Sequence, residues 1–201
     1  MYVFNHIPKC GGHTIIHALK TWNKEIILDY STRPIIKEFN PNQILCGHSI
    51  VHKYPTLFNK KNIHFFSFIR DPLSLNISLY FYFRNRGQYQ HISLNEYLFV
   101  VSLNVPNIIA RHLKCNYSNY SQIINLYSFI GIIEYIQESF NLLCLLTDHK
   151  SLILPSLNES IKDKQEVAKE IADLFRQKND LDYKIYLYCM KKFEKTLNSM
   201  S

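Results

Sequence analysis

The sequence opens with Met1-Tyr-Val-Phe-Asn-His-Ile-Pro-Lys-Cys-Gly-Gly-His-Thr-Ile-Ile16, which has the pattern of a strand, a glycine turn and a helix. Residues 2–7 form a short apolar run that favours a strand, and a helical apolar pattern starts at Ile15. The glycine turn between them is typical of an anion site, because glycine lets the backbone approach a ligand and the amides that open a helix bind anions. Lys9 adds a positive charge and Thr14 a hydroxyl. The alternative is an ordinary strand-to-helix turn with a surface lysine.

Short apolar segments with the character of strands recur along the chain and alternate with helical patterns. The strands are expected over residues 2–7, 25–29, 43–46, 63–69 and 127–133. Helices are expected over residues 13–22, 72–86, 94–103, 106–113, 138–146, 164–177 and 180–198, with loops over 115–122 and 151–163. This alternation predicts a single α/β domain over residues 1–201, built on a mainly parallel sheet.

Composition narrows the class of protein and its partners. The chain has 201 residues, of which 47% are hydrophobic, so it has enough apolar side chains for a folded globule. The net charge of +7 favours anionic partners such as a nucleotide, an acidic glycan, nucleic acid or a membrane surface. The sequence contains no run of five or more Lys and Arg residues, so it does not indicate a nucleic-acid patch.

Targeting and redox signals point to the cytoplasm. No apolar run reaches about 18 residues, the length of a membrane-spanning helix, and the first residues lack the pattern of a signal peptide. The five cysteines are odd in number and widely spaced, without the Cys/His spacing of a metal site. They are therefore expected to be reduced thiols in a cytoplasmic protein that needs no metal.

Three polar motifs follow three of the expected strands. They are the turn from Lys9 to Thr14, the pair Gly47-His48, and Arg70-Asp71-Pro72. Ligands of parallel α/β sheets bind beyond the carboxyl ends of the strands, so the three motifs are expected to meet there. Three of the chain's five glycines lie in these motifs, which agrees with a site at this edge.

The second anion contact is expected at Arg70. Its planar guanidinium can hold a phosphate with two hydrogen bonds, and the hydroxyl of Ser78, two helical turns further on, could share that phosphate. The alternatives are a surface pair of Arg70 and Asp71 that caps a helix, and an ordinary helix-surface serine. The turn itself lacks the Walker A pattern, because its lysine precedes the glycines, so a hydroxyl-held Mg²⁺ is not implied.

His48 is the candidate base. A neutral imidazole at the end of a strand could take a proton from an attacking hydroxyl near neutral pH. The chain has nine histidines, and His6, His13, His52, His64 and His112 rank below His48 for this role.

Two motifs resemble the sulfotransferase superfamily, whose donor is 3′-phosphoadenosine 5′-phosphosulfate (PAPS). Residues 7–14, IPKCGGHT, resemble its 5′-phosphosulfate loop, and residues 68–82, FIRDPLSLNISLYFY, its 3′-phosphate site. The branch with heparan sulfate and uronyl 2-O-sulfotransferases, together with its short bacterial relatives, is the most similar. Softer echoes lie at residues 107–113, 129–134 with 138–139, 157–160 and 180–186. The resemblance implies a three-layer P-loop-like fold with a central, mainly parallel sheet flanked by helices.

Residue by residue, the resemblance implies a two-part donor site and a base. The phosphosulfate group would be held by a loop of six residues, Lys9, Cys10, Gly11, Gly12, His13 and Thr14, and the 3′-phosphate by Arg70 and Ser78. His48 would be the base, and Lys9 would stabilise charge on the leaving phosphate. Two positions depart from the family pattern. His13 stands where the family has a hydroxyl residue, and Leu75 where it often has an arginine.

The implied activity is in-line transfer of a sulfuryl group from PAPS to an acceptor hydroxyl, with a carbohydrate as the expected acceptor. Tyr80, Tyr82 and residues 84–86 could face this acceptor, although packing explains the tyrosines equally well. Two other functions stay open. One is an ATP-dependent P-loop-type kinase, and the other is a non-catalytic homologue that binds a nucleotide or a glycan.

Overall fold

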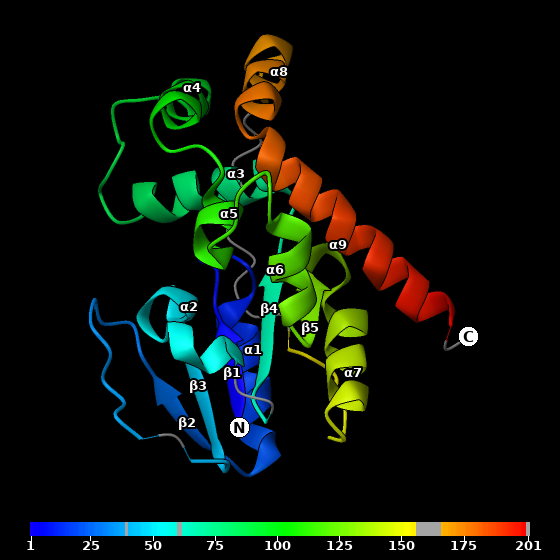
Figure 1. Cartoon of the computed structure of the whole chain (residues 1–201). Helices are drawn as coiled ribbons and strands as arrows, with labels where there is room; N and C mark the ends of the chain where they lie inside the picture. Colours follow the sequence, from blue (N-terminus) through cyan, green and yellow to red (C-terminus); the bar gives the residue numbers. More distant parts are fainter. Residues whose placement is uncertain (39, 60–61, 156–165, 200–201) are drawn as a thin grey trace.

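A single parallel sheet organises the computed structural model, which describes residues 1–38, 40–59, 62–155 and 166–199. Its strands are β1 (Tyr2–Asn5), β2 (Glu25–Leu28), β3 (Gln43–Gly47), β4 (His64–Ile69) and β5 (Phe129–Ile132). They lie in the order β2-β3-β1-β4-β5, with β1 at the centre (Figure 1). Every neighbouring pair is parallel, so the carboxyl ends of the strands meet at one edge of the sheet.

Helices flank this sheet and extend beyond its carboxyl edge (Figure 1). The α-helices of the described residues are α1 (Gly12–Leu19), α2 (Ile50–Lys53), α3 (Pro72–Arg84), α4 (Leu94–Asn104), α5 (Ile108–Leu113), α6 (Tyr120–Leu126), α7 (Ile136–Leu146), α8 (Lys169–Lys178) and α9 (Asp180–Asn198). Short 3₁₀ turns occur at η1 (Lys20–Trp22), η2 (Pro55–Asn59) and η3 (Ile133–Tyr135). The predicted fold class, a central parallel sheet flanked by helices, is confirmed.

The main core packs on both faces of the sheet, as is typical of parallel strands. In β1, Val3 and Phe4 are fully buried, and the Phe4 ring stacks on Phe66 of β4 at 5.0 Å between centroids. Val3 pairs with Leu45 of β3 on one side and Phe65 of β4 on the other. Adjacent apolar runs therefore make the sheet a rigid platform for the loops at its edge.

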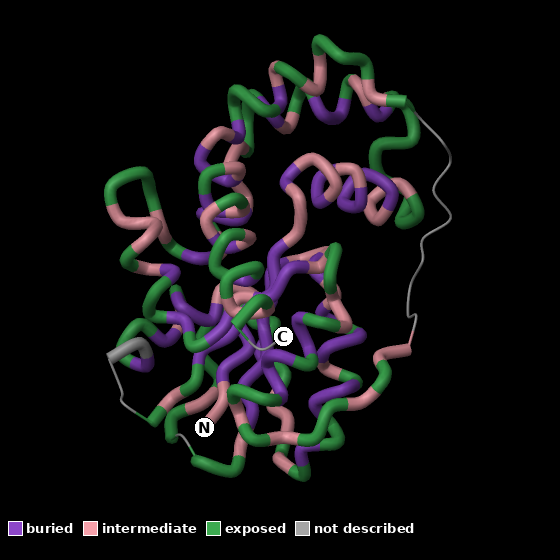
Figure 2. Tube along the Cα trace, turned by 90° about the vertical axis from the view of Figure 1, so that its right-hand side faces the viewer, coloured by how far each residue is buried: buried purple, intermediate pink, exposed green. Residues whose placement is uncertain are grey.

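A second, smaller hydrophobic cluster joins α3, α4 and α8 beyond the carboxyl edge. Its buried members are Tyr80, Phe81, Leu94, Tyr97, Leu98 and Phe175. Figure 1 shows α4 and α8 at the top of the molecule, and Figure 2 shows buried positions interspersed with exposed ones in the helices at the top. The loops that follow the strands consequently lie between the sheet and this helical layer.

Local capping explains where two of these helices begin. The Asp71 carboxylate accepts a hydrogen bond from the Ser74 amide at 2.8 Å, and Pro72 occupies the first turn of α3. Ser93 and Glu96 form a reciprocal capping box at the start of α4. Asp71 and Ser93 are both residue types that favour the N-cap position.

Two regions differ from the sequence-based expectation. Residues 115–122 are not wholly loop, because α6 begins at Tyr120, and residues 50–59, which show no clear pattern, contain α2 and η2. The expected helix over 164–177 is observed as α8, Lys169–Lys178. Most of the expected loop over 151–163, and the motif at 157–160, lie outside the described residues.

Candidate functional site

The three predicted motifs meet at the carboxyl edge of the sheet. Asn5 of β1 pairs with Gly47 of β3, and the His6 amide then donates to the Gly47 carbonyl at 2.8 Å. This bond extends the pairing of β1 and β3 by one residue, so His6 and His48 lie side by side just beyond the ends of the two strands. Arg70 follows β4, the neighbour of β1 on its other side. The loop from Lys9 therefore lies between the segments that carry His48 and Arg70.

The turn after β1 has the geometry of an anion cradle. Lys9 and Gly11 both have left-handed backbone, with φ of 61° and 69°. The first hydrogen bond of α1 runs from the Ile15 amide to the Gly11 carbonyl at 3.0 Å. The amides of Gly12, His13 and Thr14 precede this bond and have no intrahelical acceptor, so they are available to an anion.

Close packing explains the glycines of the turn. A Cβ on Gly12 would lie 1.9 Å from the His6 Nε2 atom, and one on Gly11 would lie 2.7 Å from the Ile133 side chain. Cys10 is fully buried, and its amide donates to the Ile7 carbonyl at 3.2 Å. Its contribution to the site is therefore the shape of the turn.

Three cations surround the turn. The Lys9 Nζ lies 4.8 Å from the centre of the Tyr82 ring, and the Arg86 guanidinium lies 4.3 Å from the same ring. Burial, and then the charges of Arg70 and Arg86, lower the pKa of Lys9 from its ordinary value. Within the described part of the chain, the ion pairs are Lys53–Asp29 and Lys184–Asp180, so none of the three cations has a carboxylate partner. Such a cluster of unneutralised charge favours a bound anion.

Helix α3 brings Ser78 to the same side as Tyr82. The two residues are four apart and so occupy neighbouring turns of one helix face. Ser78 is largely buried, with an exposed fraction of 7%, and Thr14 is similar at 6%, whereas His13 is exposed. Leu75, where the family resemblance implies an arginine, is fully buried in the main core.

The tyrosines and arginines at the end of α3 have separate roles. Tyr80 is fully buried, its hydroxyl donates to the Ile92 carbonyl at 3.0 Å, and Arg84 donates to that hydroxyl at 2.6 Å. This pair stabilises the helical layer. Tyr82 and Arg86 instead lie beside Lys9. From sequence, both pairs could face the acceptor and packing explained the tyrosines equally well, because helical spacing alone does not distinguish the two pairs.

His48 has the tautomer that a general base requires. Its Nδ1 lies 2.8 Å from the His6 carbonyl oxygen, and a carbonyl only accepts, so Nδ1–H is the donor. The neutral ring then has its lone pair on Nε2, which is free to take a proton. Burial lowers the pKa of His48 from its ordinary value; the hydrogen bond to His6 opposes this shift and the charge of Lys53 adds to it. The ring is therefore neutral at pH 7.

Two further histidines and a tyrosine surround His48. The His6 ring lies 4.6 Å from it, the Tyr30 ring 4.8 Å and the His112 ring 6.2 Å, measured between centroids. Burial lowers the pKa of His6 to about 3 and that of His112 to about 4. Both rings are uncharged at neutral pH, so they do not compete with the anion cradle for an anion. Sequence reasoning ranked His6 and His112 below His48 and gave them no part in its orientation.

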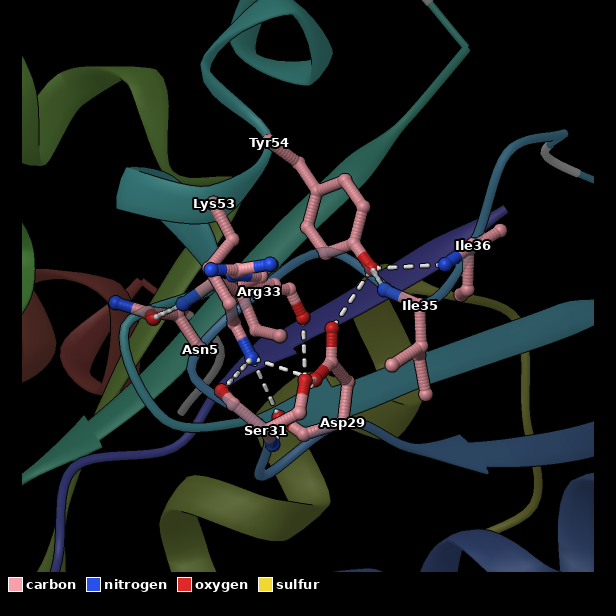
Figure 3. A network of polar contacts seen from close by, with 9 residues as sticks. Asn5, Asp29, Ser31, Arg33, Ile35, Ile36, Lys53 and Tyr54 are labelled. Atoms are coloured by element: carbon pink, nitrogen blue, oxygen red, sulfur yellow. Dashed lines mark hydrogen bonds and ion pairs between the residues drawn. The ribbon is translucent and has the colours of Figure 1, made fainter.

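A buried ionic network supports the segment that carries Tyr30 and His48 (Figure 3). The Lys53 ammonium lies 2.7 Å from the Asp29 carboxylate and donates to the Ser31 carbonyl at 3.2 Å. The Tyr54 and Ser31 hydroxyls donate to the same carboxylate at 2.7 and 2.6 Å. A Cβ on Gly47 would lie 1.9 Å from the Asp29 carbonyl oxygen, so only glycine lets the end of β3 pass this close to Asp29.

Two other classes of feature are absent from the described residues. They contain no group of three or more His, Cys, Asp or Glu side chains suited to a metal ion. None of their helices has both the length and the apolar character to cross a bilayer.

Comparison with known proteins places the fold. No family model matches the sequence, and no curated protein matches it either. The structure is similar to the crystal structure of a sulfotransferase from Alicyclobacillus acidocaldarius, with a TM-score of 0.54 and 10% sequence identity. The match covers 94% of this chain and 95% of that chain. The chain therefore has the fold of a sulfotransferase over nearly its whole length.

Proposed function

We propose that this protein is a sulfotransferase that moves a sulfuryl group from PAPS to an acceptor hydroxyl, acting as one domain. We also propose that it belongs to the branch of the superfamily with the heparan sulfate and uronyl 2-O-sulfotransferases and their short bacterial relatives. One observation carries the proposal. On a sulfotransferase fold, an unneutralised cation cluster and a correctly oriented neutral histidine meet at the carboxyl edge of the sheet.

The anion cradle fits a donor with two separated anionic groups. Lys9 and the amides of residues 12–14 would hold the phosphosulfate, and Arg70 with Ser78 would hold the 3′-phosphate. The charge cluster supports this assignment, because burial and then the positive charges of Arg70 and Arg86 lower the pKa of Lys9, and a bound anion would relieve that repulsion. The exposed His13 can offer an imidazole N–H where the family has a hydroxyl.

The chain's own residues then supply base catalysis and charge stabilisation. Bound PAPS contributes a sulfur that the acceptor oxygen attacks; the new S–O bond forms as the bond to the 5′-phosphate oxygen breaks. His48 Nε2 takes the hydroxyl proton. Lys9 and the helix amides stabilise the negative charge that develops on the departing phosphate. No metal takes part.

The expected acceptor class is a carbohydrate, through the resemblance to 2-O-sulfotransferases. The expected compartment is the cytoplasm. All five cysteines are free thiols in the structure, which supports a reducing environment.

Calorimetric titration with 3′-phosphoadenosine 5′-phosphate and with ATP plus Mg²⁺ tests the donor site. We expect binding of the first and weak binding of the second. The reverse order of affinities would indicate a P-loop-type kinase instead. Arg70→Gln should weaken the first interaction by roughly tenfold, since it removes a bidentate contact to a phosphate.

Transfer of labelled sulfate from PAPS to a panel of glycans, phenols and hydroxy acids tests the activity. His48→Ala should keep nucleotide affinity and lose transfer by about 100-fold or more. His91→Ala, which changes an exposed histidine in the loop between α3 and α4, is the matched control and should transfer at the wild-type rate. Transfer by the His48 variant at the wild-type rate would remove the base assignment. Nucleotide binding without transfer to any acceptor would indicate a non-catalytic homologue.

A further inference from the structure

A large cavity adjoins the proposed reaction centre. Its volume is about 890 Å³, which suits a small organic ligand. Pro8, which precedes Lys9, and Ser49, which follows His48, both line it. His112 lines the same end, and its Nδ1 lies 3.3 Å from the Ser49 hydroxyl. One end of the cavity thus adjoins the two turns that carry the anion cradle and the candidate base.

The walls of the cavity are apolar and come from the helical layer. They consist of Leu79, Phe83, Tyr89, Tyr97, Val101, Val105 and Ile108. These residues belong to α3, α4, the loop between them, the turn that follows α4 and the start of α5. Such a lining contacts an aromatic ring or an alkyl chain favourably, whereas it offers few partners for hydroxyls on every side of a free sugar.

The mouth of the cavity is basic. His52, Arg111 and Lys114 line it and are exposed to solvent. Among the described residues that line the cavity there is no Asp or Glu. Neither Arg111 nor Lys114 takes part in an ion pair within the described part of the chain. The mouth therefore favours a negatively charged group on the ligand.

We propose that this cavity is the acceptor site and that it takes an amphipathic hydroxyl compound, with an apolar body and one anionic group. The inference rests on the proposed function for the chemistry at the hydroxyl and departs from the expectation of a carbohydrate. The apolar body lies between α3 and α4, and the anionic group lies near Arg111. The acceptor hydroxyl points to the end beside His48, whose Nε2 receives its proton as the oxygen bonds to sulfur.

Binding, measured with 3′-phosphoadenosine 5′-phosphate present, tests the site independently of turnover. The probes are omega-hydroxydodecanoate, dodecanol and a uronic-acid disaccharide. We expect the hydroxy acid to bind more tightly than the disaccharide. Arg111→Gln should weaken the affinity for the hydroxy acid by roughly two- to fivefold and leave the affinity for dodecanol unchanged, because it removes one exposed charge.

Two cavity-filling variants and a control locate the probe. The variants are Val101→Trp and, at a more exposed position, Val105→Trp. Each should weaken the affinity for the hydroxy acid by about tenfold or more while the nucleotide affinity stays constant. Val100→Trp lies on the same helix, is 47% exposed and does not line the cavity, so it should bind as wild type does.

The outcomes separate this inference from the proposed function. Preferential binding of the disaccharide, or unchanged binding of the hydroxy acid in both cavity-filling variants, would overturn the inference and leave sulfotransfer standing. A third outcome is that the two variants lose the hydroxy acid but the protein does not bind 3′-phosphoadenosine 5′-phosphate. This outcome would support the cavity as a ligand site and overturn the proposed function.

Discussion

Lys53→Met should destabilise the protein strongly, although the residue lies outside the proposed donor site. In the wild type its ammonium lies 2.7 Å from an Asp29 carboxylate oxygen and 2.7 Å from the Asp29 carbonyl oxygen. The side chains of Lys53 and Asp29 are 7% and 0% exposed. Methionine keeps most of the length of the side chain and removes the charge, so the variant leaves a buried carboxylate without its cation.

The size of the effect follows from this burial. Removing one partner of a buried ion pair costs about 3–5 kcal/mol, because the remaining charge is desolvated and uncompensated. Two hydroxyl donors, from Tyr54 and Ser31, remain on Asp29, which places the expected loss near the lower value. For a chain of 201 residues, with an unfolding entropy of about 0.4 kcal/mol/K, a loss of about 3 kcal/mol lowers the thermal midpoint by about 7 °C.

Thermal unfolding followed by circular dichroism measures this shift, and Lys184→Met is the matched control. Lys184 lies 2.8 Å from Asp180, but both side chains are about half exposed, at 50% and 47%, so no resolvable shift is expected. Similar shifts in the two variants would refute the reasoning from burial.

The pH dependence gives a second check on the same pair. Burial raises the pKa of Asp29, but hydrogen bonds from Lys53, Ser31 and Tyr54 outweigh it, and the net pKa lies below its ordinary value. The stabilisation is therefore present above the unfolded pKa of about 3.9 and is lost as the pH falls through the folded pKa. In Lys53→Met the unpaired carboxylate is protonated more readily. The loss of thermal stability in Lys53→Met, relative to the wild type, should consequently shrink as the pH is lowered from about 7 to about 4. A loss that stays constant over this range would contradict the stabilising role of the ion pair.

Three further predictions concern other positions. Gly12→Ala should lower the free energy of unfolding by about 1–3 kcal/mol in urea titrations, because its Cβ would lie 1.9 Å from the His6 ring; an unchanged midpoint would contradict this packing. Transfer by the wild type should rise with pH through a midpoint below about 6.5, because burial lowers the pKa of His48 and the base must be neutral; a midpoint above this value in a pH–rate profile would oppose that role. Burial raises the pKa of Asp182 to about 7, so the wild type should lose thermal stability between about pH 4 and about pH 7 relative to Asp182→Asn, and parallel profiles would exclude the shift.

The sheet could be predicted from sequence because each strand is specified locally. The run over residues 63–69, for example, is apolar at nearly every position, so its side chains leave water only if both faces of the strand are buried. Strand β4 is observed there. The cap at Asp71 is equally local, because its carboxylate and the Ser74 amide that donates to it are three residues apart. The catalytic and binding roles of Lys9, Arg70 and His48 stay predictions, whereas their meeting at one sheet edge is observed.

Features that depend on distant residues could not be predicted. Helix α6 contains one buried residue, Ile124, and its Tyr120 ring packs on Tyr188 of α9 at 5.9 Å between centroids. Its helical state is therefore set by tertiary packing and not by its own pattern. His6 was missed as a positioning residue for a different reason. It orients His48 through its backbone carbonyl, a group that every residue has.

The candidate base and the candidate anion cradle depend on different parts of the fold. The cradle is built from the turn between β1 and α1, from Arg70 after β4, and from residues at the end of α3. His48 is instead placed by β3, by the His6 carbonyl and by the Asp29 network behind Gly47. Loss of the Asp29–Lys53 pair should therefore disturb His48 before it disturbs the donor site. A destabilised variant that still binds nucleotide but transfers sulfate slowly would have this structural origin, and it would separate orientation of the base from binding of the donor.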